Sequence, residues 1–382
     1  MTTAATDIFP PRAVCDISMS AVQENVRSLI SRLSGGTELW AVVKANAYGH
    51  DVEYVAEAVV SAGARRLCVA TLSEALHLRR MGMRVPMLVM GPLDRSGMER
   101  AAHADVDVTV LSPSMVRHAC ELASTTGARA LRVHLKVNTG MGRWGVPLDQ
   151  AIAALASLDA AVGIDVVGLM THFATADNAD DDGFFNLQLD RFVELADHAR
   201  ELVPGIVVHA ANSAATMRSS SAHFDAVRCG IALYGLSPTQ GDARADGLRP
   251  ALALRSHISD IRELEVGESV GYGRAWIANE RSRVALVPMG YADGVRRLLS
   301  GTAHALVNGH RLTYAGTVSM DHLSLIIPDG MSVAIGDVVT IIGADGDNEV
   351  SAEDHARWAG TINYEITCGI ANEPRLQRRF DV

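Results

Sequence analysis

Lys44 follows a short run of apolar residues, Leu39 to Val43, and precedes a loop marked by Gly49. The apolar run predicts a buried strand, so the amine at its end is partly removed from water. Desolvation favours the neutral form of an amine, which is the form that attacks a carbonyl carbon. Lys44 is therefore a candidate for forming an imine with an aldehyde-bearing cofactor. Taken alone, the same residue fits a solvated lysine at the end of a strand.

Polar residues, one glycine and one isoleucine also lie at or just after the carboxyl ends of other predicted strands. They are Lys136, Arg143, His172, Asp177, Asn212, Ser213, Arg228, Gly230 and Ile231. If the strands are parallel and form a barrel, these residues converge at the rim formed by the carboxyl ends of the strands. Asn212 and Ser213 begin a predicted helix, whose free N–H groups favour a phosphate, and Gly230 lets the backbone approach a ligand. Taken alone, Ser213 fits a plain helix N-cap, and His172 fits a core histidine.

From Trp40 to Gly235, short apolar strands alternate with amphipathic helices. The predicted strands are Trp40–Lys44, Leu67–Thr71, Pro86–Met90, Val106–Val110, Leu131–Val137, Val166–Thr171, Ile206–His209 and Ala226–Arg228. The predicted helices include Val52–Ala62, Ser73–Met81, Pro113–Ser124, Pro147–Leu158, Phe184–Val203 and Ser213–Arg218. This alternation predicts an α/β fold with an N-terminal (β/α)8 TIM-like barrel. An open doubly wound sheet is the alternative.

After Pro250 the pattern changes to alternating apolar and polar residues without long helices. Strands are predicted at Val284–Val287, Ala305–Val307, Ser324–Ile327 and Val338–Ile342, and an alternating segment opens at Ala251–Ile258. One late helix is predicted at Ser351–Ala359, and Thr239–Gly247 is the natural linker. The sequence thus predicts a barrel domain over residues 1–245 and a mostly antiparallel β C-terminal domain over residues 246–382.

Composition narrows the function classes. The chain has 382 residues, of which 48% are hydrophobic and 20% charged, which is typical of a soluble globular protein with two domains. A formal net charge of -10 without a basic run argues against nucleic acid as a partner. We expect no membrane-spanning segment and no secretory leader. Five separated cysteines predict buried thiols in a reducing cytoplasm, and no histidine or cysteine spacing predicts a metal site.

The segment Ala41–His50 resembles the cofactor-lysine signature of the alanine racemases that depend on pyridoxal 5'-phosphate (fold type III). Further segments resemble this family in the same order along nearly the whole chain. They are Thr139–Arg143, Thr171–Ala174, Ala211–Ala214, Val227–Ile231, Gly271–Gly273, Gly290–Gly294, Ser319–Asp321 and Ile362–Glu365. The resemblance implies a barrel followed by a β domain, a homodimer with shared active sites, and interconversion of L- and D-alanine by proton exchange at Cα on two faces.

The resemblance also implies roles for individual residues. Lys44 would hold the cofactor and serve one face of Cα, while Tyr272 from the partner subunit would serve the other. Arg228 would bond the pyridine nitrogen, and His172 would hold Arg228 in place. Because a guanidinium does not release its proton, the ring nitrogen would stay unprotonated, which disfavours transamination.

The remaining roles implied by the resemblance concern the phosphate, the substrate and the access path. The cofactor's phosphate group would be bound by Tyr48, Ser213, Gly230, Ile231 and Tyr364, and Asn212 would also belong to the cofactor-binding residues. The substrate would contact Arg143, Met320 and Asp321, and the access channel would be lined by Asp177, Tyr291 and Arg297. Lys136 corresponds to a lysine that is often carbamylated in this family and orients Arg143.

Three positions depart from the family pattern: Asn138, Trp144 and Ser319. None removes a catalytic group, but Trp144 and Ser319 could change the wall of the pocket, so serine or another small amino acid is an alternative substrate. A related decarboxylase of basic amino acids is a second alternative, although such enzymes pair the ring nitrogen with a carboxylate. A third is a non-catalytic pyridoxal-phosphate carrier on a lone barrel, which would lack the β domain.

Overall fold

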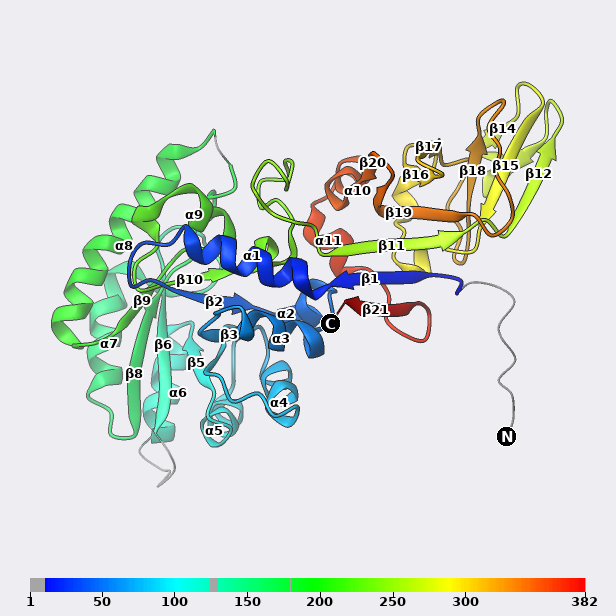
Figure 1. Cartoon of the computed structure of the whole chain (residues 1–382). Coiled ribbons are helices and arrows are strands. Elements are labelled where there is room, and N and C mark those ends of the chain that lie inside the picture. Colours follow the sequence, from blue (N-terminus) through cyan, green and yellow to red (C-terminus); the bar gives the residue numbers. More distant parts are fainter. Residues whose placement is uncertain (1–10, 124–129, 179, 382) are drawn as a thin grey trace, which may run out of the picture. The chain divides into compact units, whose positions relative to one another are not determined.

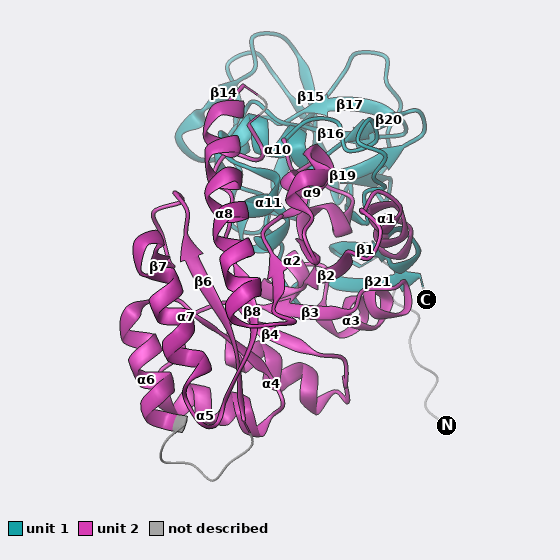
Figure 2. Ribbon diagram, turned by 90° about the vertical axis from the view of Figure 1, so that its left-hand side faces the viewer, with its two compact units in different colours: residues 1–21, 240–382 teal, residues 22–239 magenta. Residues whose placement is uncertain are grey.

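The computed structural model describes residues 11–123, 130–178 and 180–381 (Figure 1). The chain divides into two compact units, which Figure 2 shows in magenta and teal. The barrel unit comprises the described residues of Val22–Thr239. The β unit comprises the described residues up to Ala21 and those from Gln240 onward.

Parallel strands form the core of the barrel unit. They are β2 (Glu38–Val42), β3 (Arg66–Val69), β4 (Met87–Val89), β5 (Asp107–Val110), β6 (Leu131–Asn138), β7 (Val146–Pro147), β8 (Ile164–Met170), β9 (Val207–His209) and β10 (Ala226–Cys229). The nine-stranded sheet runs in the order β5-β4-β3-β2-β10-β9-β8-β6-β7, and β5 also pairs with β6. Since β7 pairs only with β6, the other eight described strands close a ring. The predicted barrel is confirmed, and the open doubly wound sheet is wrong.

Helices follow most of these strands, and one further helix, α1 (Met19–Ser31), precedes the first of them. The others are α2 (Lys44–Tyr48), α3 (Val52–Ser61), α4 (Leu72–Arg80), α5 (Arg95–His103), α6 (Pro113–Ala123), α7 (Ala151–Asp159), α8 (Asp182–Leu202) and α9 (Ser213–Arg218), with 3-10 turns η1 (Leu148–Gln150), η2 (Ser220–Ala222) and η3 (Ile231–Tyr234). The sequence did not predict α5, because polar residues separate its few buried apolar ones. The predicted helix Pro113–Ser124 ends at a residue that lies outside the described ones.

Strand β6 shows how the barrel interior becomes polar. Leu131, Val133, Leu135 and Val137 alternate with Arg132, His134 and Lys136, and successive side chains of a strand point to opposite faces. His134 and Lys136 are nevertheless buried. The polar set therefore occupies successive levels of the barrel interior, while the apolar set packs on the other face.

The β unit contains two larger sheets and a hairpin. The first sheet comprises β1 (Val14–Ser18), β11 (Leu252–His257), β16 (His304–Val307), β17 (His310–Thr313), β19 (Val338–Asp345), β20 (Asn348–Val350) and β21 (Gln377–Asp381). The others comprise β12 (Asp260–Leu264), β15 (Ser282–Val287) and β18 (Leu323–Ile327), and the pair β13 (Ser269–Val270) and β14 (Trp276–Ile277). The helical segments are α10 (Ala352–Ala359), α11 (Asn363–Cys368), η4 (Tyr272–Arg274), η5 (Tyr291–Asp293) and η6 (Arg297–Leu299).

Strand pairing in the β unit is antiparallel among the described residues except between β1 and β21. This confirms the predicted mostly antiparallel domain. Strand β1 lies between β11 and β21, so an N-terminal strand completes a sheet built otherwise from the C-terminal third. The domain limits of 1–245 and 246–382 remain a prediction.

The cysteines differ partly from the prediction. Cys15, Cys68 and Cys229 are buried, whereas Cys120 is half-buried and Cys368 is exposed. The prediction of buried thiols is wrong for the last two, because they occupy helical positions in α6 and α11 that reach the surface.

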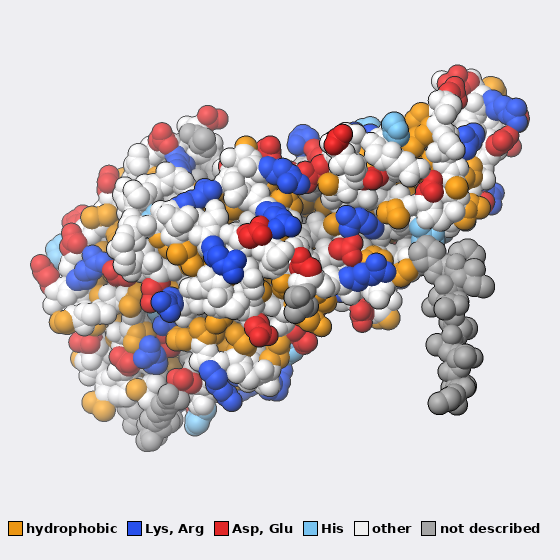
Figure 3. All heavy atoms as spheres, viewed as in Figure 1, with side chains coloured by type: hydrophobic (Ala, Val, Ile, Leu, Met, Phe, Trp, Pro, Cys, Tyr) orange, Lys and Arg blue, Asp and Glu red, His pale blue; other side chains and the backbone are white. Residues whose placement is uncertain are grey.

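Charged side chains of both signs are interspersed over the face shown in Figure 3. This mixture accompanies a formal net charge of -10 for the whole chain. In the described part of the chain, no helix has both the length and the apolar character needed to cross a membrane.

Candidate active site

Lys44 opens a strained turn at the carboxyl end of β2. Strand β2 ends at Val42, two residues before the predicted end, because the backbone turns at Val43. Ala45, Asn46, Ala47 and Tyr48 then have φ values of 53°, 52°, 53° and 54°. These left-handed conformations cost an L-residue about 1–2 kcal/mol each. Backbone strain of this kind gathers at functional sites, where the surrounding structure holds it in place.

Two side chains hold this left-handed turn. Glu74 Oε1 accepts the backbone N–H of Ala45 at 2.7 Å, and Asn46 Oδ1 accepts that of Val52 at 2.9 Å. The second carboxylate oxygen of Glu74 accepts the N–H of Thr71 at 2.9 Å, within the capping box of α4. The position of Lys44 is thus tied to the loop that follows β3.

A cradle of hydroxyl and backbone groups lies at the ends of β2, β9 and β10. Asn212 caps α9 through its side chain, and Ser213 Oγ accepts the N–H of Gly230 at 2.9 Å. A Cβ at Gly230 would lie 2.5 Å from the Tyr48 hydroxyl, so only glycine fits there without displacing that hydroxyl. The hydroxyls of Ser213 and Tyr48, each of which can donate a hydrogen bond, thus meet beside the backbone of Gly230 and of Ile231 at the start of η3, an arrangement that suits a phosphate.

Arg228 is buried in β10 and fixed through both terminal nitrogens. Nη1 donates to His209 Nδ1 at 2.7 Å and to the His209 carbonyl at 2.9 Å. Nη2 donates to the carbonyls of Thr171 at 2.7 Å and Ala210 at 2.9 Å, and lies 3.3 Å from His172 Nδ1. The expected contact with His172 is therefore present, but the closer imidazole belongs to His209, to which the sequence assigned no such role. Among the described residues, the Nε–H of Arg228 has no acceptor, so it remains for a ligand.

Burial sets the charge states around Arg228. Burial lowers the pKa of Arg228 to about 10, so the guanidinium is still cationic at neutral pH. Burial, followed by the charge of Arg228, lowers the pKa values of His172 and His209 well below the usual histidine value. Both imidazoles are therefore neutral at neutral pH.

Four cationic side chains gather at this rim of the barrel. Burial, then the charges of Arg228, Arg143 and Lys44, lower the pKa of Lys136 to about 8. Arg143 is exposed, and its guanidinium carbon lies 5.9 Å from the ring centroid of Trp144. Lys44 and Lys136 are the two lysines of the whole chain. Because like charges repel one another, this group of cations favours an anionic ligand, whose charge offsets the repulsion.

The predicted site residues of the β unit lie mainly on its surface. Tyr272 is 74% exposed, Met320 is 51% exposed and Tyr291 is 43% exposed. Thr317 Oγ1 donates to the carbonyl of Tyr272 at 3.1 Å, and the N–H of Tyr291 donates to the carbonyl of Ser319 at 2.9 Å. The loops that carry these residues therefore support one another.

The other predicted residues occupy separate loops and one helix. Arg297 and Asp321 are exposed, and Asp321 Oδ1 accepts a hydrogen bond from Arg375 at 2.6 Å. Tyr364 is half-buried in α11 of the β unit. Asp177 is exposed in the barrel unit, in the loop after β8. The structure thus joins the loops of Tyr272, Tyr291 and Ser319 by hydrogen bonds, whereas the roles of Arg297, Asp321, Tyr364 and Asp177 remain predictions.

Comparison with known proteins agrees with this arrangement. The chain matches the sequence profile of the alanine racemase N-terminal domain over residues 17–238 and that of the alanine racemase C-terminal domain over residues 251–380. An alanine racemase from Symbiobacterium thermophilum is 39% identical over 366 residues, which cover 94% of this chain and 96% of that protein. Alanine racemase 1 from Bacillus subtilis is 40% identical over 368 residues, covering 96% of this chain and 92% of the relative.

Solved structures show the same similarity. A crystal structure of alanine racemase from Bacillus anthracis with bound L-Ala-P has a TM-score of 0.88 and 37% identity, covering 98% of this chain and 96% of that one. Alanine racemase from D-cycloserine-producing Streptomyces lavendulae has a TM-score of 0.90 and 35% identity, covering 98% of both chains.

These features define a two-domain barrel enzyme. Its eight-stranded barrel carries amines, a buried guanidinium and a hydroxyl-lined cradle at the carboxyl rim, and its second domain is antiparallel β. The chain belongs to the alanine racemase family. The family resemblance predicted from the sequence is thereby confirmed.

Proposed function

We propose that this protein interconverts L- and D-alanine with pyridoxal 5'-phosphate held by Lys44. The observation that carries the proposal is the hydroxyl and glycine cradle of Ser213, Gly230 and Tyr48 beside an amine on a strained turn. The names of the relatives and the L-Ala-P bound to one similar structure support alanine as the substrate.

The residues present fit the cofactor at both of its polar ends. The phosphate would be held by Tyr48, Ser213, Gly230 and Ile231, with Tyr364 as a further ligand. Asn212 would contribute by capping α9 beside the cofactor. When bound, pyridoxal phosphate supplies an electron-withdrawing ring that makes the Cα–H bond of an attached amino acid more acidic. The hydroxyls of Ser213 and Tyr48 support this assignment, because each can donate a hydrogen bond to a phosphate oxygen.

Arg228 would donate its Nε–H to the ring nitrogen. A guanidinium with a pKa of about 10 stays protonated at neutral pH, so it offers the nitrogen a hydrogen bond but not a proton. An unprotonated ring withdraws electrons less strongly, which favours return of the proton to Cα over its transfer to the cofactor. A decarboxylase of this fold type pairs the nitrogen with a carboxylate, so Arg228 favours racemisation.

Two groups on opposite faces of Cα would carry the protons: Lys44 on one face and Tyr272 on the other. We propose that Tyr272 comes from the partner subunit of a homodimer. The 74% exposure of Tyr272 supports this role, because its side chain is available to a second chain.

The substrate carboxylate would be bound by Arg143, the backbone N–H of Met320 and the loop of Asp321. Lys136 would be carbamylated and would orient Arg143. A pKa of about 8 leaves part of the Lys136 amine neutral near physiological pH, and the neutral amine is the form that adds carbon dioxide. A carbamate would also place a negative charge among the surrounding cations.

We propose that the enzyme works in the cytoplasm. The access channel would be lined by Asp177, Tyr291 and Arg297. All three side chains are exposed, as residues of such a channel must be.

The function is tested by incubating the purified enzyme and pyridoxal phosphate with single enantiomers of alanine, serine, lysine and ornithine. Chiral chromatography should show alanine racemising in both directions. A higher kcat/KM for serine would assign the alternative substrate, and carbon dioxide release from lysine or ornithine would contradict racemisation.

A further inference from the structure

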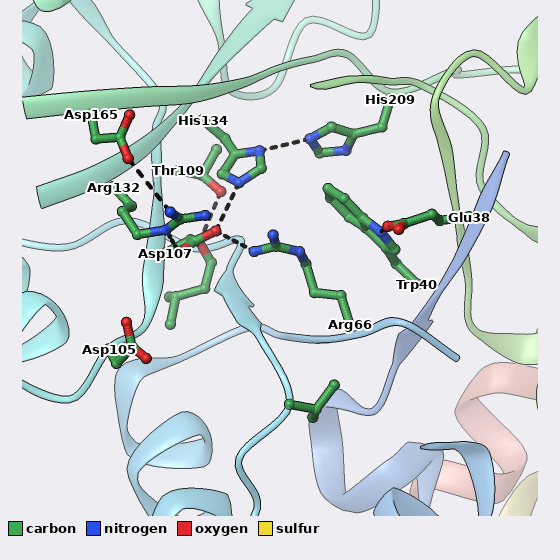
Figure 4. Close-up of polar contacts among 12 residues, drawn as sticks. Glu38, Trp40, Arg66, Asp105, Asp107, Thr109, Arg132, His134, Asp165 and His209 are labelled. Carbon is green, nitrogen blue, oxygen red and sulfur yellow. Dashed lines mark hydrogen bonds and ion pairs between the residues drawn. The ribbon is translucent and has the colours of Figure 1, made fainter. Parts of the chain in front are cut away.

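A line of hydrogen bonds crosses the interior of the barrel from Arg228 to Asp107, and Figure 4 shows the part from His209 to Asp107. Arg228 Nη1 lies 2.7 Å from His209 Nδ1, and His209 Nε2 lies 2.9 Å from His134 Nδ1. His134 Nε2 then lies 3.2 Å from Asp107 Oδ2. Asp107 is the first residue of β5, so the line runs from Arg228, near the rim that carries the site, to the amino-terminal end of the barrel strands.

The chemistry of the two ends fixes the direction of every bond. A guanidinium only donates, so His209 Nδ1 accepts and the neutral His209 carries its proton on Nε2. That proton is donated to His134 Nδ1, which leaves the proton of His134 on Nε2. A carboxylate only accepts, so His134 Nε2–H donates to Asp107. Both rings therefore have the same tautomer.

The barrel is shaped around this line. A Cβ at Gly168 of β8 would collide with the His134 ring, and the pairing register of β6 with β8 shifts at His134. The Trp40 ring packs against both imidazoles, with ring centroids 5.8 Å from His134 and 4.5 Å from His209. The absent side chain at Gly168 and the contacts with Trp40 thus enclose the two rings.

The line also connects opposite charges. Among the described residues, no carboxylate forms an ion pair with Arg228. The nearest carboxylate along its hydrogen bonds is Asp107, which is also paired with Arg66 and with Arg132, whose Nε lies 2.9 Å from Oδ1. Charge at both ends strengthens and orders a chain of neutral hydrogen bonds between them.

We propose that Asp107, His134 and His209 are positioning residues that hold Arg228 in one orientation, so that a carboxylate at the far rim sets the donor geometry at the active site. The consequence for catalysis rests on the proposed contact of Arg228 with the ring nitrogen. Groups that orient a ligand-binding residue through a hydrogen bond commonly change activity by roughly 10- to 100-fold when altered.

The first test needs no cofactor. Nitrogen-15 NMR of the cofactor-free protein, assigned with the His134→Gln and His209→Gln variants, should show both rings neutral and protonated on Nε2. A proton on Nδ1 of either ring, or a charged ring at neutral pH, would overturn the proposal. This test uses the protein with Asp107 in place, so it remains decisive even if variants at Asp107 fail to fold.

The second test compares Asp107→Asn with Asp165→Asn. The first substitution keeps an acceptor oxygen at position 107 but removes the charge, whereas Asp165 pairs with the outer side of Arg132 at 3.4 Å and does not touch the imidazoles. We expect Asp107→Asn to shift the His209 nitrogen signals and to lower kcat for alanine roughly tenfold, with KM within about twofold and more pyruvate as a side product. Asp165→Asn should change neither signals nor kcat by more than about twofold.

If Asp107→Asn and Asp165→Asn had the same kcat and the same histidine nitrogen signals, the proposal would be overturned. Failure of the wild-type enzyme to racemise alanine would instead overturn the proposed function. The two failures are distinguishable, because the nitrogen signals are read without cofactor or substrate.

Discussion

The hydroxyl of Ser213 accepts the backbone N–H of Gly230 at 2.9 Å, which joins the start of α9 to the loop after β10. The same glycine is the point where the Tyr48 hydroxyl approaches the backbone. Three barrel strands thus contribute to one cradle, and its dimensions depend on the missing side chain at position 230.

Gly230→Ala should weaken binding of pyridoxal phosphate. Its φ of -120° and ψ of -90° lie outside the main allowed regions for an L-residue, and the new Cβ would lie 2.5 Å from the Tyr48 hydroxyl and displace it. We expect the Kd of the cofactor to rise on the order of tenfold, since one hydrogen bond to a charged group is lost. Fluorescence titration measures this, and Gly183→Ala, where nothing lies within 4 Å, is the matched control. An unchanged Kd in Gly230→Ala would remove the cradle from cofactor binding.

Tyr272→Phe should affect the two directions of racemisation unequally. The change removes the phenol that exchanges the proton on one face of Cα, while Lys44 still serves the other. We expect kcat to fall by roughly 100- to 10,000-fold, and exchange of the Cα proton for solvent deuterium to persist mainly from one enantiomer. Tyr54→Phe, at an exposed tyrosine of α3, is the control. Near wild-type rates both ways would exclude Tyr272 as the second base.

Arg228→Lys should keep the charge and lose the geometry. A lysine ammonium cannot donate to His209 and to Thr171 while it also presents a donor in the position of Nε–H. We expect kcat for alanine to fall on the order of 100-fold, with pyruvate rising as a share of product. Coupled assays for D-alanine and pyruvate measure both. If Arg228→Lys had the same kcat and the same share of pyruvate as the wild type, the proposed role of the two-sided guanidinium contacts would be contradicted.

Lys136 should make the stability of the cofactor-free protein depend on alkaline pH. Between pH 8 and pH 10.5 the unfolded chain keeps a proton on this lysine that the folded chain has released, so the free energy of unfolding rises with pH there. The whole rise amounts to about 3 kcal/mol, since each unit of pKa shift is worth about 1.4 kcal/mol.

Urea unfolding across this range, in buffer free of carbon dioxide, measures the effect. Lys136→Met should remove the rise and stabilise the protein at pH 7. Parallel pH profiles for the two proteins would show that Lys136 keeps an ordinary pKa.

The alternation of strands and helices was sufficient to predict the barrel, because each barrel strand is an apolar run bounded by turn residues. All predicted barrel strands are present with ends shifted by no more than two residues. Strand β1 was not predicted, because its five residues gain their structure from pairing with β11 and β21, which are far away in the sequence. Long-range pairing of this kind leaves little local signal.

The left-handed turn after Lys44 had no signal either. Ala45, Asn46, Ala47 and Tyr48 are not glycines, and no residue type in this segment indicates their left-handed conformation. Backbone hydrogen bonds of the turn and the side chains of Glu74 and Asn46 hold it in place. The role of His209 was also missed, although the alternation of Arg132, His134 and Lys136 in β6 indicates a polar barrel interior. Identifying the partner of a buried histidine requires the positions of the strands in space.

Attachment of the cofactor to Lys44 is the central claim, and the composition of the chain makes its test direct. Only two lysines exist, Lys44 and Lys136, so a reduced covalent adduct has few alternative sites. The enzyme should be mixed with pyridoxal phosphate, reduced with borohydride, digested and mapped by mass spectrometry, with Lys44→Ala as the control. We expect one pyridoxyl group on Lys44, and loss of the visible absorbance of bound cofactor in Lys44→Ala. A label on Lys136, or no label at all, would contradict the account.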